Sequence, residues 1–422
     1  MRNRWIIPGL LVAAGLHAGP AADHARAQPT AWDVSGNEHP PVWAPIGTYQ
    51  HDGSGWYTAA EFLLLNQPRA IGHQRVAVRG FVDSAGLLTG TPGAFIGSGE
   101  EALNTNEFGR TGWSPGQRVT LGYRLENGWS FSVSWLHLYD TKYSAGAGII
   151  GPNFQNPGNN LENTFLFSPV FNFSQEFMGP SARNTTGGDI TVNGFIVFSD
   201  LAGIWNGASD MTILFTQRFD NWDFAGRFPV FETENARSYA IAGARFSWIW
   251  ERLQWRTVAS GIKVKGVDEA EPPTIVNQPD WTARYLDTLS QRMYGPMIGS
   301  GHEVMLYSGH GGAVGFGVEC TGALLVDIAK ERAKYIREDR ATQSKRSWVE
   351  NEIVPNVNLE FNLTWQPVDG LTFKAGWSAL NYFNTLYMEH PIGFNFGAID
   401  PAYEKRFWRC IHGCNFGVGY TW

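Results

Sequence analysis

Residues 356–366 read Asn-Val-Asn-Leu-Glu-Phe-Asn-Leu-Thr-Trp-Gln, so polar and apolar side chains alternate along the whole segment. A period of two is the pattern of a β-strand with one apolar and one polar face. The turn sequence Pro-Val-Asp-Gly follows at 367–370, and the alternation resumes over 371–378. The two segments therefore predict an antiparallel hairpin.

The same alternation recurs along the chain. Residues 119–125 and 129–135 alternate on either side of Glu-Asn-Gly at 126–128, and Asn-Gly favours a tight hairpin turn. Patterns of this kind predict ten strands, near residues 56–65, 117–125, 128–139, 208–219, 237–250, 288–307, 312–327, 355–366, 371–382 and 414–422. A hairpin in the apolar stretches 164–173 or 191–198 would raise the number to twelve; alternatively, these stretches pack as a loop in the mouth of a barrel.

The composition excludes several other classes of protein. The chain has 422 residues, of which 43% are hydrophobic and 17% charged, and it holds 49 Gly, 27 Phe, 18 Trp and 14 Tyr. This is enough apolar material for a large ordered body, so disorder is excluded. After the N-terminus no run of about 18 apolar residues appears, which excludes membrane-spanning helices. A net charge of −7 gives no basic stripe for nucleic acid, so nucleic-acid binding is not expected.

The N-terminus has the features of an export signal. Arg2 and Arg4 form a basic region, residues 5–16 form a short apolar core, and Ala-Arg-Ala at 25–27 offers a cleavage site before Gln28. An N-terminal membrane anchor is the alternative, although the apolar core is short for a membrane span. Residues 1–27 are therefore predicted to be a signal peptide, 28–54 an extended periplasmic arm, and 55–422 the barrel.

Alternating strands fit either a soluble sandwich with its apolar faces inside or a membrane barrel with those faces toward lipid. The polar faces are mostly Ser, Thr, Asn and Gly, as a solvated lumen permits, and aromatic residues recur near strand ends, as in an interfacial girdle. The chain also ends in a strand in which Phe416, Tyr420 and Trp422 share a face, which resembles the terminal assembly signal of bacterial outer-membrane barrels. We therefore predict an all-β, antiparallel transmembrane β-barrel of about 10–12 strands, with apolar faces toward lipid and polar faces toward a watery lumen.

The connections between predicted strands largely alternate in length, with long ones after the first, third, fifth, seventh and ninth strands. This predicts long extracellular loops and short periplasmic turns. The loop expected at 327–352 is rich in charges of both signs. It could contact anionic surface polymers, or it could be an ordinary solvated loop.

Four stretches carry a family resemblance: Asn160–Phe167, Gly243–Val258, Asp327–Tyr335 and Phe383–Thr385. From about residue 110 onward the chain resembles the outer-membrane barrel proteins of planctomycetes, which are related to the Legionella-type pore-forming outer-membrane family. The resemblance implies an exported, porin-like barrel in the cell outer membrane and attaches no catalytic residue to it.

Catalytic and metal signatures are weak in this sequence. The nearest acid–base pairs are His137 with Asp140 and His302 with Glu303, and there is no GxSxG, HExxH or P-loop. No catalytic residue, cofactor or metal site is therefore predicted, and the protein is not expected to be an enzyme. The three cysteines, Cys320, Cys410 and Cys414, are too few to organise the fold and do not match a CxxC motif.

Two functional hypotheses remain. The first is a porin-like barrel that lets small polar solutes diffuse through a lumen lined by charged residues of both signs, namely Glu61, Arg118, Arg124, Arg245, Glu319, Glu360 and Lys374. The second is a structural or surface-interaction barrel with a plugged lumen and adhesive external loops. In either case the expected partners are outer-membrane lipid and the barrel-assembly machinery, with small polar solutes added in the first case; the oligomeric state is open.

Overall fold

The computed structural model describes the following residues of the chain: 54–83, 89–149, 165–172, 191–192, 195–196, 204–233, 236–259, 261–263, 274–276, 282–310, 312–338, 340, 343–368, 370–398 and 406–422. The predicted signal peptide and, except for residue 54, the predicted arm lie outside the described residues.

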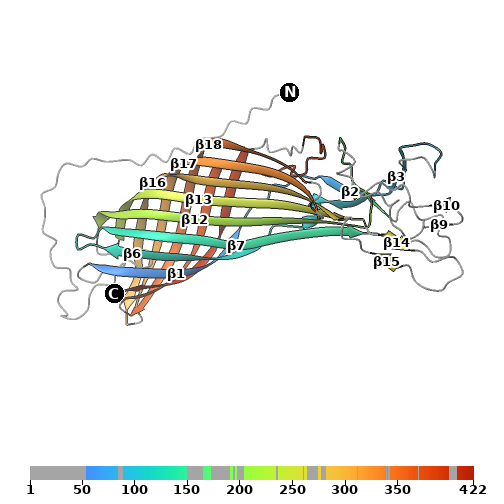
Figure 1. The fold of residues 1–422 in the computed structure, drawn as a ribbon. Coiled ribbons are helices and arrows are strands. Elements are labelled where there is room, and N and C mark those ends of the chain that lie inside the picture. Colours follow the sequence, from blue (N-terminus) through green and yellow to red (C-terminus); the bar gives the residue numbers. More distant parts are fainter. Residues whose placement is uncertain are drawn as a thin grey trace, which may run out of the picture. The chain divides into compact units, whose positions relative to one another are not determined.

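Ten antiparallel strands form a closed barrel, in which the last strand pairs with the first (Figure 1). In chain order they are β1 (Gly55–Asn66), β6 (Trp113–Arg124), β7 (Ser130–Gly148), β12 (Asp210–Glu232), β13 (Ala236–Val258), β16 (Thr282–Gly309), β17 (Gly312–Arg337), β18 (Gln343–Val368), β19 (Leu371–Leu386) and β20 (Arg406–Thr421). The order around the wall is β1-β20-β19-β18-β17-β16-β13-β12-β7-β6. The predicted all-β, antiparallel barrel is confirmed, and the number of strands in the wall is ten. Among the residues described, no helix has the length and apolar character of a membrane span.

Short connections gather at one end of the barrel, which we call the turn end. The strand pairs β6–β7, β12–β13, β16–β17 and β18–β19 meet there, and the other end carries the long connections 67–112, 149–209, 259–281 and 387–405. We call that other end the cap end. The predicted alternation of long and short connections is confirmed except after the seventh strand.

The charged segment 327–352 is the exception, because most of it is strand rather than loop. β17 continues to Arg337 and β18 begins at Gln343. The mixed charges of this segment sort onto two faces, with Lys330 and Arg332 outward and Asp327 and Glu331 inward. The prediction of a long loop was wrong because a strand that alternates acidic and basic residues reads, in composition, like a solvated loop.

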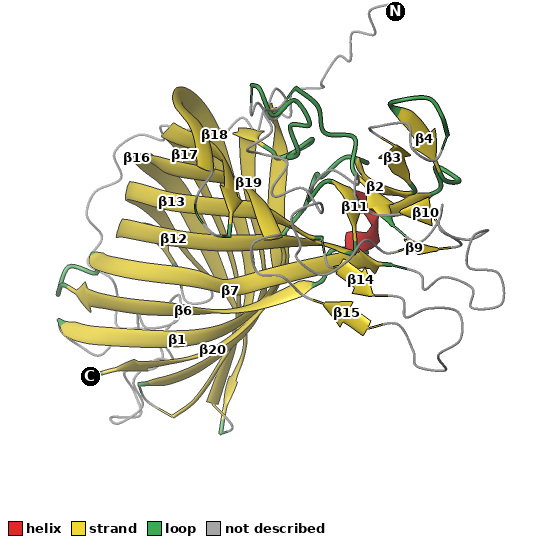
Figure 2. Cartoon of the chain, turned by 45° about the vertical axis from the view of Figure 1, so that its right-hand side comes forward, coloured by secondary structure: helices red, strands yellow, loops and turns green. Residues whose placement is uncertain are grey.

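The cap end is covered by small elements from the long connections (Figure 2). The cap strands are β2 (Arg75–Arg79), β3 (Phe81–Asp83), β4 (Ala94–Ile96), β5 (Glu101–Asn104), β8 (Leu166–Phe167), β9 (Thr191–Val192), β10 (Phe195–Ile196), β11 (Asn206–Ala208), β14 (Gly261–Lys263) and β15 (Thr274–Val276). Four of them form a sheet with the order β11-β8-β2-β5, and the 3-10 turn η2 (Thr105–Phe108) directly follows β5. β8 joins the cap sheet and β9 pairs with β10, so the described residues of the stretches 164–173 and 191–198 add no strand to the wall.

The wall changes its polarity along its length. In the part nearer the turn end, outward side chains are large and apolar: Phe361, Leu363 and Trp365 are exposed on β18. Nearer the cap end the alternation inverts, so that Leu253 and Trp255 of β13 point inward and are buried while Arg252 points outward. The inversion follows if the outside meets lipid near the turn end and water near the cap end.

The inside of the cap end is a packed, mostly apolar core rather than a watery lumen. Trp205, from the connection before β11, lies among inward-facing rings, with centroids 4.5 Å from Trp255 of β13 and 5.9 Å from Tyr335 of β17. Phe396, from the connection after β19, stacks on Tyr285 of β16 at 5.9 Å. These five rings are buried, so the expectation that inward faces are polar throughout the barrel was wrong for this end. The apolar cap segments supply the rings' packing partners, which a water-filled lumen would not.

Close packing between β1 and β6 constrains one position of the wall. Tyr57 of β1 pairs with Thr421 of β20 on one side and Gly122 of β6 on the other. The buried Tyr57 ring lies against Gly122 so closely that a Cβ at this position would overlap the ring. Glycine is therefore required at position 122 for the inward aromatic ring to fit the wall.

Candidate functional site: the barrel interior

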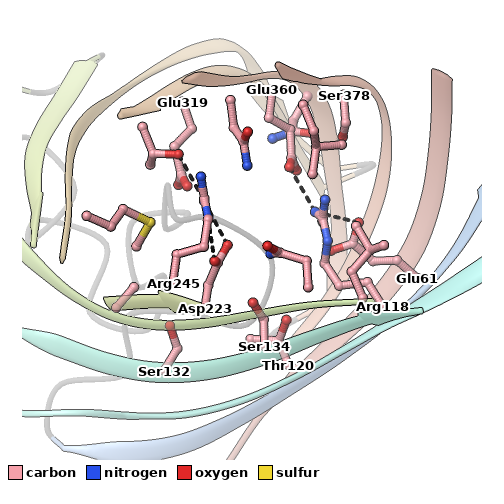
Figure 3. Close-up of a pocket in the computed structure, with 18 of the residues that line it drawn as sticks. Glu61, Arg118, Thr120, Ser132, Ser134, Asp223, Arg245, Glu319, Glu360 and Ser378 are labelled. Carbon is pink, nitrogen blue, oxygen red and sulfur yellow. Dashed lines mark hydrogen bonds and ion pairs between the residues drawn. The ribbon is translucent and has the colours of Figure 1, made fainter. Parts of the chain in front are cut away.

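The interior near the turn end holds a polar cavity (Figure 3). Its volume is about 90 Å³, which is room for several waters. Strands β1, β6, β7, β12, β13, β16, β17, β18 and β19 contribute to its lining. Six of the seven residues predicted to line a lumen line this cavity: Glu61, Arg118, Arg245, Glu319, Glu360 and Lys374.

Four of these charges form one cluster where β1, β6, β18 and β19 face each other across the interior. The Arg118 guanidinium donates to Glu360 at 2.8 Å and lies 3.3 Å from Glu61. Lys374 contacts both carboxylates, at 3.4 Å from Glu61 and more closely to Glu360. Asn415 of β20 donates to Glu61 at 3.1 Å. Two cations therefore balance two anions in a part of the barrel that shows little surface to solvent.

A second ion pair lies on the neighbouring part of the wall. Arg245 of β13 forms a bidentate pair with Asp223 of β12, at 2.6 and 2.9 Å. Its guanidinium also donates to Thr321 at 3.1 Å and to the Asn356 side chain, so partners from three strands, β12, β17 and β18, hold it in place. Bidentate arginine–carboxylate pairs fix geometry as well as charge.

A third group occupies the turn-end side of the cavity. Arg227 of β12 donates to Ser132 at 2.8 Å and lies 3.2 Å from Glu319 of β17. Tyr239 donates to the same glutamate at 3.2 Å. Arg124, the seventh predicted residue, is buried at the end of β6 next to the turn and is not part of the cavity lining.

On the cap-end side of the cavity, an ion pair crosses the barrel. Arg409 of β20 donates to Glu251 of β13 at 2.6 Å, and both side chains are almost completely buried. These strands are five positions apart in a ring of ten, so the pair joins opposite walls. Arg409 also donates to the Leu386 carbonyl at 3.1 Å and lies 4.0 Å from the centroid of the Tyr387 ring. Gln217 donates to Glu251 at 2.9 Å, which gives the carboxylate a second donor.

A contact between two hydroxyl groups crosses the barrel on the turn-end side of this pair. Ser247 of β13 and Tyr382 of β19 are 2.9 Å apart, and Ser247 donates to Asn221 of β12 at 2.7 Å. Tyr382 also donates to Asn221 at 3.4 Å. We call Arg409, Glu251, Tyr382, Ser247 and Asn221 the transverse layer. From turn end to cap end, the interior is therefore a polar cavity, the transverse layer and the apolar core.

The transverse layer was not predicted from the sequence. Glu251 follows the predicted end of its strand at 250, and Arg409 precedes the predicted start of its strand at 414. A signal was nevertheless present for Glu251. It lies six residues after Arg245 on β13, and an even separation along a strand places both side chains on the same, inward face.

The profile of a family described as the Legionella pneumophila major outer membrane protein precursor matches residues 54–396. The chain belongs to this family. The Legionella-type part of the predicted resemblance is thereby confirmed, whereas the relation to planctomycete proteins stays a prediction. Membership and the barrel fold place the chain among outer-membrane proteins.

Solved structures of several outer-membrane proteins are distantly similar. The protease OmpT from Escherichia coli has a TM-score of 0.34 at 10% identity, covering 87% of this chain and 97% of its own. The TodX monoaromatic hydrocarbon channel mutant has a TM-score of 0.19 at 7% identity, covering 89% and 91%. A Pseudomonas aeruginosa FadL homologue has a TM-score of 0.19 at 8% identity, covering 88% and 90%. No curated protein matches the sequence. At these distances, no activity passes from these proteins to this family member.

The acid–base pairs singled out in the sequence do not come together. His137 bonds to Asp220 at 2.7 Å, while Asp140 pairs with Arg218. His137 and Asp140 therefore bond to other residues and not to each other. His302 and Glu303 are consecutive residues of β16, and consecutive strand residues point to opposite faces. His302 is exposed on the outer face, whereas Glu303 is buried on the inner one.

The three cysteines are free thiols. Cys320, Cys410 and Cys414 lie on outward positions of β17 and β20. Across the described residues, no three His, Cys, Asp or Glu side chains gather in a metal-binding arrangement.

Proposed function

We propose that this outer-membrane barrel is a closed structural element of the cell envelope, which holds a folded cap on its external side, rather than an open diffusion pore. The observation that carries the proposal is the buried Arg409–Glu251 pair, which joins opposite walls at 2.6 Å. A solute moving along the axis would have to separate these charges. Breaking a buried pair typically costs about 3–5 kcal/mol.

The apolar core at the cap end supports the same conclusion. Trp205 and Phe396 come from connections between strands and pack on inward-facing wall residues. A solute entering from the cap end would meet this core before reaching the transverse layer. Barrels of about eight strands are commonly filled by their own side chains, and a barrel of ten strands is only slightly wider.

Diffusion of small polar solutes is the second candidate, and the polar cavity favours it. The cavity has room for several waters and is lined by charges of both signs, which would give little ion selectivity. Conduction would then require both the transverse layer and the apolar core to open. The proposal contains no catalytic step, because the candidate acid–base pairs point to different partners or faces.

Single-channel recording in planar bilayers separates the two candidates. The closed barrel predicts no stable current steps from folded wild-type protein. It also predicts none from the double variant Arg409→Leu, Glu251→Leu, because the apolar core around Trp205 and Phe396 stays in place. Stable steps from the wild type would instead establish the pore, and Lys374→Glu or Glu319→Lys should then shift its ion selectivity.

Export and assembly complete the proposal. Residues 1–27 would be removed in the periplasm, which sequencing of the mature N-terminus tests through the appearance of Gln28. Phe416 and Tyr420 are exposed on the outer face of β20, with Trp422 just beyond the strand, where assembly machinery could read them.

A further inference from the structure

The outer face of the wall carries a group of cations just beyond its apolar part. They lie on four consecutive strands of the barrel, β12, β13, β16 and β17 (Figure 1). We call this group the outer cationic patch, and its members are Arg218, Arg252, Arg292, Lys330 and Arg332.

The strand register brings the patch together. Arg218 is opposite Trp250, which is opposite Ser290, which in turn is opposite Lys330. The next row toward the cap end places Arg252 opposite Thr288, and Thr288 opposite Arg332; Arg292 is opposite Trp248. Four neighbouring strands span about 14 Å at the usual spacing of about 4.8 Å. Several cations are therefore within reach of one head group.

Two tryptophans form the floor of the patch. The Arg252 guanidinium lies 4.7 Å from the centroid of the Trp250 ring, and that of Arg218 lies 5.5 Å from it. Arg292 lies 5.8 Å from the Trp248 centroid, and the Trp248 indole donates to Ser290 at 3.0 Å. Guanidinium groups stacked on aromatic rings are held in place yet keep donors free for an anion.

Most of these cations have no acidic partner. Asp140 forms a bidentate pair with Arg218, at 2.7 and 3.0 Å. Within the part of the chain that the structure describes, no carboxylate forms an ion pair with any of the other four cations of the patch. Asp220 borders the patch on β12, but it already accepts from the Trp135 indole and bonds to His137. Five cations thus face two carboxylates.

The place of the patch along the wall decides what can bind it. Toward the turn end, the outward residues that follow are apolar and exposed: Phe224 on β12, Tyr294 and Ile298 on β16, and Leu324 on β17. A ligand that touches the patch from the side is therefore next to the lipid-facing surface. Trp248 and Trp250 stand at this border, where aromatic rings gather in membrane barrels.

We infer that the outer cationic patch binds the phosphate groups of an anionic lipid in the external leaflet, with the acyl chains lying along the apolar wall. Arginine recognises phosphate through paired donors, and three of the four cations without acidic partners are arginines. The inference is independent of the state of the lumen, so it stands whether the barrel is open or closed.

Lipid binding to the full-length folded protein in detergent, followed by native mass spectrometry, tests this inference. The probe is a bis-phosphorylated acylated disaccharide lipid, and the comparison is the same lipid after enzymatic removal of both phosphates. The wild type should bind the phosphorylated lipid at least fivefold more tightly. Equal binding of the two lipids would overturn the inference without the use of any variant.

A matched pair of triple variants locates the site. Arg252→Gln, Arg292→Gln and Arg332→Gln together should weaken binding of the phosphorylated lipid at least fivefold.

The control triple removes the same charge from outward positions nearer the cap end, with Arg256→Gln, Arg284→Gln and Lys345→Gln, and should change binding less than twofold. Equal losses in both would show that only net charge matters, and no loss in the patch variant would show that the lipid binds elsewhere; either result overturns the assignment. If inorganic phosphate at equal concentration displaces the lipid, the site recognises phosphate alone, and a lipid is not its specific occupant.

Discussion

Replacing Arg409 by leucine is expected to destabilise the barrel by about 3–5 kcal/mol, because Glu251 would stay buried with its charge unpaired. A cost in the same range applies to Glu251→Leu, which would leave the fully buried guanidinium of Arg409 without its carboxylate. For Glu251→Leu we expect the lower end of this range, because the guanidinium keeps its contacts with the Leu386 carbonyl and the Tyr387 ring. The double variant buries no charge, so its cost should fall below the sum of the single variants by about 1–3 kcal/mol.

Equilibrium unfolding in urea, with tryptophan fluorescence as the signal and the barrel folded in vesicles, measures these free energies. Arg406→Leu provides the reference, since its pair with Glu350 is partly exposed and should contribute no more than about 1 kcal/mol. Single variants at Arg409 and Glu251 that each cost under about 1 kcal/mol, and that add without coupling, would falsify the description of a buried pair joining opposite walls.

Three further predictions concern the wall and its seam. Gly122→Ala should cost about 1–3 kcal/mol in urea unfolding, because the new methyl group overlaps the Tyr57 ring, whereas Gly112→Ala, which meets no atom within 4 Å, should leave stability unchanged. Glu360→Gln removes a carboxylate that two cations share and should cost about 1.5–3 kcal/mol in the same assay; an unchanged midpoint would show that the cluster adds nothing to stability. Tyr420→Ser should lower the amount of folded barrel in the outer-membrane fraction of cells without changing the stability of purified protein, and a normal yield would remove this position from the assembly signal.

The strands were predictable where the two faces of the wall differ most. Between 356 and 366, apolar residues meet lipid and polar ones face the cavity, so the period of two is plain in the sequence. Strand ends near the cap were missed because the alternation inverts there. On β13, tryptophans point outward at 248 and 250, but Leu253 and Trp255 point inward. If every apolar residue is taken to face lipid, the strand is predicted to end at this reversal.

The polar residues of the interior were predictable as a face but not as pairs. Glu360 and Lys374 lie on the polar sides of neighbouring strands, so the alternation of each strand already predicts that both side chains point into the barrel. Which cation meets which anion across the barrel depends on the closed ring and on its register. Arg409 and Glu251 are 158 positions apart in sequence, and no local pattern relates them.

The seam between β1 and β20 has a consequence for the order of folding. This seam joins the first wall strand to be synthesised with the last one. Its residue pairs run from Tyr57 with Thr421 to Asn66 with His412. Until β20 is available, β1 has one unsatisfied edge, and so does the strand that will neighbour β20. Such open edges invite pairing with other chains. We therefore expect the unfolded chain to need shielding of these edges until β20 pairs with β1, and a chain that stops before β20 to aggregate rather than form a smaller barrel.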